Sequence, residues 1–224
     1  MLDLPLTFLN RPAAVGTARP WLLVLMHGVG SNEQDLFGLA PHLPPQFTVL
    51  SLRAPYVLGP GAFSWFDFAL EPGGVRRIDH AQEAASRAQL AQVLQSASQQ
   101  LGIPPERVVV GGFSQGGIMA LSLLLTRPEL MGAAMVWHSR MLEQVLAAHS
   151  APPSALEGKK LWLSHGTHDD VIPLAQAQAI AKHVQILPVE LTYREFAGAH
   201  ELPTDELVAT LEWLQKLSTA PTAG

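Results

Sequence analysis

Short, continuously apolar runs recur along the chain and alternate with longer amphipathic stretches. Runs such as WLLVLM lack a polar face, which is typical of strands that are covered on both sides. Alternation of such strands with helices predicts an α/β fold with a mostly parallel central sheet and helices on both faces. The expected strands are 6–10, 21–26, 48–52, 107–111, 132–137, 161–165 and 189–194, and the expected helices are 79–101, 115–126, 174–184 and 204–217.

The length of 224 residues suits one domain, because the 48% of hydrophobic residues can fill a core of that size. We expect a single domain over 1–224, with a frayed tail over 218–224. The glycine- and proline-rich segment 54–75 carries several aromatic residues and predicts an ordered loop. This loop is either a wall of a substrate pocket or apolar padding beneath a surface loop.

Charge patterning disfavours two classes of partner. Only 15% of residues are charged, and the net charge of -5 comes without a long run of one sign, whereas nucleic acids and anionic membranes call for clustered Lys and Arg. The first ten residues contain Asp3 and Pro5 and lack the pattern of a signal peptide. The apolar run 21–26 is too short to span a bilayer. We expect a cytoplasmic protein without stable membrane insertion, and both a monomer and a homodimer remain open.

The segment Gly112-Phe113-Ser114-Gln115-Gly116 matches the G-x-S-x-G pattern of a nucleophile elbow. It follows the strand-like RVVVG and precedes the apolar, helical IMALSLLLT. At such a turn the residues two before and two after the serine approach neighbouring backbone, which leaves no room for a β-carbon. The pattern predicts that Ser114 is a nucleophile; the alternative is a buried serine at an ordinary strand–helix turn.

A serine nucleophile requires a base, itself oriented by a third group. In hydrolases with this elbow the chain order is serine, acid, histidine, which excludes the histidines at positions 27, 42 and 80. His183 lies in a helical pattern and His149 in a polar, alanine-rich segment. His200 lies in a loop after the last strand, where a doubly wound sheet places its ligands. We therefore predict His200 as the base.

Two adjacent carboxylates compete for the role of the acid in the turn HGTHDDVIP. The spacing from Gly166 and to Pro173 favours Asp169 as the inward-pointing residue. The alternative use of Asp170 is to cap the helix that begins near Pro173. We therefore predict Asp169 as the acid that orients the base.

Backbone N–H groups must stabilise the negative charge that develops on the attacked carbonyl oxygen. One donor is expected at Gln115, at the start of the helix after the nucleophile. The other is expected at Val29, in the glycine-bearing loop directly after WLLVL. Alternatively, Gly28 and Gly30 only form a tight turn; they lack the third glycine of a dinucleotide fingerprint.

Neither a metal nor a cofactor is expected. The chain has no cysteine, so thiolate metal sites and cysteine nucleophiles are excluded. His165 and His168 form a His-x-x-His pattern on a turn, but no third ligand lies nearby in the sequence, which favours a structural role over zinc binding.

Four stretches in matching order, HGVGSNEQD, GFSQGG, HGTHDDVIP and GAHELP, resemble the phospholipase/carboxylesterase family of small α/β-hydrolases, which includes bacterial carboxylesterases and acyl-protein thioesterases. The resemblance covers nearly the whole chain. It implies an α/β-hydrolase fold without a large lid domain and without a cofactor. Carried over by position, it implies the nucleophile Ser114, the acid Asp169, the base His200 and the oxyanion amides of Val29 and Gln115.

The resemblance also implies an acyl pocket bordered by the loop that holds Trp65 and Asp67, because Ser64-Trp65-Phe66-Asp67 is similar to the family's Ala-Trp-Tyr-Asp. The chain departs from the family pattern at Trp137-His138-Ser139, where the family tends to carry Leu-Ser-Gly. We expect Phe63, Trp65 and Trp137 to fill a narrow cleft that favours short to medium acyl chains.

Three functions follow from these expectations. The first is a serine carboxylesterase acting on small to medium acyl esters through an acyl-enzyme, with a small-molecule ester as its partner. The second keeps the triad but acts on a protein thioester or a lysophospholipid. The third is a non-catalytic binding module, because a fold does not guarantee an activity.

Overall fold

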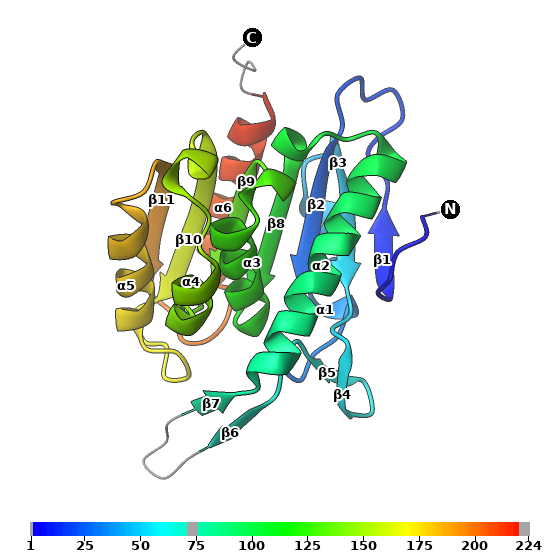
Figure 1. Ribbon diagram of the computed structural model, residues 1–224. Coiled ribbons are helices and arrows are strands. Elements are labelled where there is room, and N and C mark those ends of the chain that lie inside the picture. The colour runs from blue at the N-terminus through cyan, green and yellow to red at the C-terminus, as the bar shows by residue number, and fades with distance from the viewer. Residues whose placement is uncertain (1, 71–75, 220–224) are drawn as a thin grey trace.

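The computed structural model describes residues 2–70 and 76–219. Within them, seven strands form one sheet in the order β1-β3-β2-β8-β9-β10-β11, in which β1 is antiparallel to β3 and the other neighbours are parallel (Figure 1). Each predicted strand overlaps one of these seven, so the mostly parallel sheet is confirmed. The strands are β1 (Phe8–Arg11), β2 (Trp21–Met26), β3 (Phe47–Leu52), β8 (Val108–Phe113), β9 (Ala133–Trp137), β10 (Lys159–Gly166) and β11 (Val189–Phe196).

Helices cover both faces of the sheet (Figure 1). Apolar side chains of α2, α3, α4 and α5 pack in one core cluster, and those of α1 and α6 pack in a second cluster on the opposite face. The helices are α1 (Gln34–Phe37), α2 (His80–Leu101), α3 (Gln115–Thr126), α4 (Glu143–His149), α5 (Leu174–Val184) and α6 (Thr204–Thr219). Short 3-10 turns occupy η1 (Ala40–His42), η2 (Pro105–Arg107), η3 (Pro128–Leu130) and η4 (Pro153–Leu156).

The two-sided core explains the continuously apolar strands. All six side chains of β2 are buried. Because successive side chains of a strand point to opposite faces, Leu22 and Val24 join the cluster with α2 and α3, whereas Leu23 and Leu25 join the cluster with α1 and α6. A polar residue at either set of positions would be buried without a partner, which accounts for the run WLLVLM.

The long helix α2 has the ends that its sequence predicts. The Asp79 side chain accepts hydrogen bonds from the N–H groups of Ala81 and Gln82 at the N-terminus. At the other end Gly102 adopts a left-handed conformation with φ 63°, which glycine enters without a steric penalty.

The segment 54–75 contains more regular structure than the expected loop. It forms a hairpin of β4 (Tyr56–Gly59) and β5 (Ala62–Ser64), followed by β6 (Phe68–Leu70), which pairs with β7 (Arg76–Ile78). Residues 71–75 lie outside the described residues. Both hairpins lie at the end of the sheet to which the parallel strands point (Figure 1), and no large lid domain is present in the described parts of the chain.

The C-terminal helix is longer than predicted. α6 continues through residues 218 and 219, which were expected to fray, and the Ser218 hydroxyl donates to the carbonyl of Leu214. The remainder of the expected tail, 220–224, lies outside the described residues. The structure also adds α4, which no sequence pattern predicted. None of the helices in 2–70 and 76–219 is long and apolar enough to cross a membrane.

Candidate active site

Ser114 sits between β8 and α3 in a conformation that few residues adopt. Its φ is 53° and its ψ is −115°. The two flanking glycines have no space for a side chain, since a β-carbon on Gly112 would lie 2.3 Å from the carbonyl carbon of Gly116. A β-carbon on Gly116 would lie 2.0 Å from the carbonyl oxygen of Met26. The strand–turn–helix geometry of a nucleophile elbow therefore accounts for both glycines.

Three side chains from distant segments form one hydrogen-bonded chain. His200 Nε2 lies 2.9 Å from Ser114 Oγ, and His200 Nδ1 lies 2.7 Å from Asp169 Oδ2. Ser114 follows β8, Asp169 follows β10 and His200 follows β11, so all three stand at the carboxyl ends of parallel strands. The structure thus brings together the residues that the sequence predicts as nucleophile, acid and base.

The carboxylate of Asp169 is buried and fully hydrogen-bonded. Its Oδ1 accepts from the N–H groups of Val171 at 2.9 Å and Ile172 at 2.8 Å. Burial opposes its ionisation, but the hydrogen bonds from His200 and Ile172 outweigh this effect and hold the pKa of Asp169 below its ordinary value. Asp170 is exposed to solvent. Of the two adjacent carboxylates, the structure directs Asp169 toward the histidine.

This arrangement has the polarity that serine activation needs. An ionised Asp169 accepts a hydrogen bond from His200 Nδ1, which leaves the lone pair of Nε2 facing the hydroxyl of Ser114. The imidazole can then take the hydroxyl proton as the oxygen attacks a carbonyl.

The loop after β2 lies against the nucleophile. A β-carbon on Gly28 would stand 3.4 Å from the β-carbon of Ser114. Gly30 has φ 83°, and the side chain of Val29 between them is 40% exposed. Gln115 is the first residue of α3, where a backbone N–H has no acceptor within the helix. The two predicted oxyanion donors, Val29 and Gln115, therefore belong to backbone segments that flank Ser114 closely.

Hydrogen bonds tie this loop to the segment 63–66. Phe63 exchanges backbone hydrogen bonds with Gly30 and Ser31, at 2.8 and 2.9 Å. The indole N–H of Trp65 donates to the carbonyl of His27 at 2.9 Å. The side chain of Gln115 accepts from the N–H of Trp65 at 2.8 Å and donates to the carbonyl of the next residue at 2.6 Å. The side chain of Gln115 thus holds the backbone of residues 65–66, while its own backbone begins the helix that follows the nucleophile.

Two of the three residues expected in the pocket lie in the core instead. Trp65 has no exposed surface, because its ring is covered and its N–H is bonded to His27. Trp137 is 2% exposed and points to the α6 face, where its N–H lies 3.2 Å from Thr210 Oγ1 and its ring borders an apolar cavity of about 240 Å³. Phe63 is partly exposed and carries the guanidinium of Arg53 4.7 Å from its ring centre. Strand alternation explains the error for Trp137, since its neighbour Val136 takes the opposite face.

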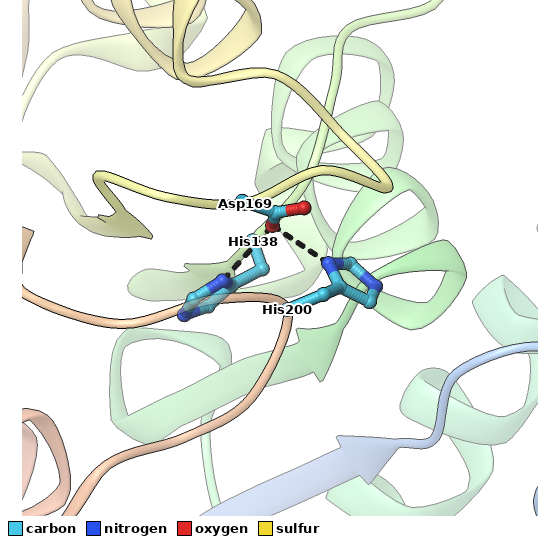
Figure 2. Close-up of side chains that lie close together, drawn as sticks. All are labelled: His138, Asp169 and His200. Carbon is cyan, nitrogen blue, oxygen red and sulfur yellow. Dashed lines mark hydrogen bonds and ion pairs between the residues drawn. The ribbon is translucent and has the colours of Figure 1, made fainter.

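A histidine and a glutamate that sequence reasoning missed lie behind the acid. His138 Nδ1 is 3.1 Å from Asp169 Oδ2, and His165 Nε2 is 3.3 Å from the same oxygen, which therefore faces three imidazoles. Figure 2 shows His138 and His200 on either side of the carboxylate. His138 Nε2 is 3.0 Å from Glu206 Oε2. Among described residues other than glycine, positive φ occurs at Ser114 and His138 alone, so both backbone distortions are at this site.

Glu206 lies in the first turn of α6 and is fully buried. Helical spacing contains the missed signal, because Glu206, Thr210 and Leu214 recur at intervals of four and all three are buried on one face. His138 had a weaker signal, a polar residue directly after the apolar run AAMVW.

The donor set also has the composition of a metal site. His138, Asp169 and His200 offer ligand atoms within 4.8 Å of one another. Each of these contacts is also at hydrogen-bond distance, and both rings direct Nδ1 at the same oxygen, which suits proton donors to a shared carboxylate. Of the two histidines in the His-x-x-His pattern, His165 is buried with Nε2 2.7 Å from the carbonyl of Ile172, and His168 is exposed. This separation favours the structural role expected for that pattern.

Comparisons with known proteins identify the family of the chain. Residues 16–218 match the family model described as phospholipase/carboxylesterase. Acyl-protein thioesterase 1 of Schizosaccharomyces pombe is 29% identical over 160 residues, which cover 70% of each chain. The structure of esterase PE8 is 28% identical with a TM-score of 0.78, covering 95% of this chain and 99% of the other. The Bacillus cereus carboxylesterase shares the fold, with 23% identity, a TM-score of 0.79 and 95% coverage of both chains. The chain belongs to the phospholipase/carboxylesterase family and is a hydrolase of ester or thioester bonds.

Proposed function

We propose that the protein is a serine carboxylesterase that cleaves small to medium acyl esters through an acyl-enzyme on Ser114. The observation that supports this most is the unbroken hydrogen-bonded chain from Ser114 through His200 to the ionised Asp169. A serine hydroxyl in such a chain attacks the ester carbonyl while the imidazole takes its proton. The imidazolium then protonates the leaving alcohol. Water next attacks the acyl-enzyme with His200 again as the base, which releases the acid and restores Ser114.

The oxyanion donors in this proposal are the backbone N–H groups of Val29 and Gln115. Both segments are fixed before a substrate arrives, one by its hydrogen bonds to Phe63 and the other by the helix that it starts. Fixed donors need no reorganisation as charge develops, and one such donor commonly stabilises the transition state by about 3 kcal/mol.

The preference for short to medium acyl chains rests on the wall formed by residues 63–66. Trp65 is immobilised by hydrogen bonds from its backbone and its ring, and Phe63 is tied to the oxyanion loop. We expect a segment held in this way to resist the displacement that a long acyl chain beside Phe63 would require. Hydrolysis rates for p-nitrophenyl esters should therefore peak well below sixteen carbons, and an optimum at sixteen would contradict the proposal.

A thioesterase is the second candidate, because relatives that align with most of the chain are named acyl-protein thioesterases. The triad treats both kinds of acyl carbonyl alike, so only rates can separate them. We expect the ester of a short acyl group to have a higher kcat/KM than the matched acyl-peptide thioester, and the opposite order would favour the second candidate.

Labelling with a fluorophosphonate distinguishes both enzymes from a binding module. Intact mass should show one adduct on wild-type protein and none on Ser114→Ala. A folded wild-type protein that stays unlabelled and inactive on every ester and thioester would refute the hydrolase proposals for Ser114 and leave the binding module.

A further inference from the structure

A buried histidine connects the proposed acid to a second carboxylate. His138 lies between Asp169 and Glu206, with contacts of 3.1 and 3.0 Å from its two ring nitrogens. The side chains of all three residues have no exposed surface. The proposed ester cleavage uses neither His138 nor Glu206, so these two residues still lack a role.

The two carboxylates favour the protonated form of this histidine. Burial alone would lower the pKa of His138, but hydrogen bonds and charge from Glu206 and Asp169 outweigh burial and raise it above the usual value. A protonated ring donates from both nitrogens, as the two contacts require. The other possible partner of Nδ1 is the N–H of Gly166 at 3.4 Å, a longer contact than the one to Asp169.

Glu206 is anchored at the far end of this arrangement. Its Oε1 accepts a hydrogen bond of 2.6 Å from Ser164 Oγ, and that hydroxyl accepts one of 3.0 Å from Trp162 Nε1. The carboxylate therefore reaches His138 from α6 in a fixed position, and every buried polar atom of the side chain has a partner.

The titratable groups that face His138 come from three parts of the fold. Asp169 and His165 belong to β10 and the loop after it, Glu206 belongs to α6, and His200 belongs to the loop after β11. His165 stacks on His138 with ring centres 5.1 Å apart, and burial lowers the pKa of His165, which favours its neutral form. The ring centres of His138 and His200 are 5.8 Å apart. At this distance a positive charge on one ring opposes a second positive charge on the other.

We propose that His138 and Glu206, here called the supporting pair, position Asp169 and moderate the attraction of its carboxylate for a proton on His200. The inference rests on the proposed esterase function. His138 and His200 both direct Nδ1 at Oδ2 of Asp169, and His165 Nε2 lies 3.3 Å from the same oxygen. Neither the charge nor the orientation of the carboxylate therefore serves His200 alone. With the supporting pair in place, the enzyme stays active at lower pH than without it.

The double variant His138→Gln/Glu206→Gln tests this directly. It removes one positive and one negative charge together, so no buried charge is left unpaired. We expect the acid limb of kcat/KM for p-nitrophenyl acetate to move up by about one pH unit. A purely structural role would lower activity at every pH without moving this limb. An acid limb at its wild-type position would overturn the proposal.

Asp170→Asn is the matched control, because it removes an exposed carboxylate next to Asp169 and should leave the limb unchanged. Fluorophosphonate labelling separates the two proposals. Wild-type protein that resists labelling would refute the esterase, whereas labelled wild type with an unmoved limb in the double variant would refute the supporting pair alone.

A second measurement uses the wild-type protein alone and needs no variant. Nitrogen-15 spectra of histidine-labelled wild-type protein report the protonation of each ring. The His138 ring should still carry both protons at pH values where an ordinary histidine has lost one. A neutral ring whose Nδ1 accepts from Gly166 would overturn the proposal.

Discussion

Replacing Asp169 by Asn should abolish most of the activity while preserving the fold, because the backbone fixes how the new amide must lie. The N–H groups of Val171 and Ile172 both donate to Oδ1 in the native turn. An asparagine must therefore place its carbonyl oxygen there. The reversed orientation would leave two buried donors unpaired at about 1–3 kcal/mol each.

The amide nitrogen of this asparagine then faces His200 and His138, so the His138 ring must also give up its Nδ1 proton. Since the amide NH₂ donates, Nδ1 of His200 must accept, and its proton moves to Nε2, next to Ser114. A nitrogen that carries a proton cannot take one from the hydroxyl. The equivalent change in a serine protease triad costs about 10⁴-fold in kcat, which corresponds to about 5 kcal/mol of transition-state stabilisation.

Initial rates on p-nitrophenyl acetate at saturating concentration measure this effect. Asp170→Asn is the matched control, because it makes the same chemical change one residue away at an exposed position and should retain kcat within about threefold. Circular dichroism should show that both variants are folded. A folded Asp169→Asn that keeps more than about a tenth of the wild-type kcat would refute the tautomer argument.

Three further predictions test the site and its surroundings. Ser114→Ala should lower turnover about a thousandfold or more in the same ester assay, and smaller losses would mean another nucleophile. Gly116→Ala should destabilise the protein by about 3 kcal/mol or more in urea unfolding, because its β-carbon would meet the carbonyl oxygen of Met26 at 2.0 Å, whereas Gly59→Ala meets nothing within 4 Å and should change stability by less than about 1 kcal/mol. Because the pKa of Asp169 is lower in the folded than in the unfolded state, its ionisation stabilises the fold at pH values above the unfolded pKa. This stabilisation is lost as the pH falls below about 4, so the acid unfolding of Asp169→Asn should be less steep than that of the wild type.

The parts of the fold that local pattern determines were predictable from the sequence. Strand β2 must be apolar on both sides, and Asp79 and Gly102 mark the ends of α2 by chemistry that acts within a few residues. The positions of Ser114 and His200 could also be predicted from the sequence, because the elbow is a local constraint and the order of the triad is a topological one.

Contacts between distant segments were not predictable in this way. The sequence leaves open which face of β9 Trp137 takes, and the strand's position in the sheet directs it toward α6 rather than the pocket. His138 and Glu206 are separated by 68 positions, and each is an ordinary polar residue until the fold buries both against Asp169. Helical spacing can indicate that Glu206 is buried, but it does not indicate which residue Glu206 contacts.

The hydrogen bonds between the oxyanion loop and residues 63–66 have a consequence for how substrates enter. Phe63 bonds to Gly30 and Ser31, and Trp65 bonds to His27, so one backbone segment cannot swing outward without dragging the other. An outward movement of residues 63–66 would also displace the loop that carries Val29, the proposed oxyanion donor. We therefore expect a substrate to enter without movement of this segment, so that fit to a preformed site, rather than closure around the substrate, decides the selectivity among esters.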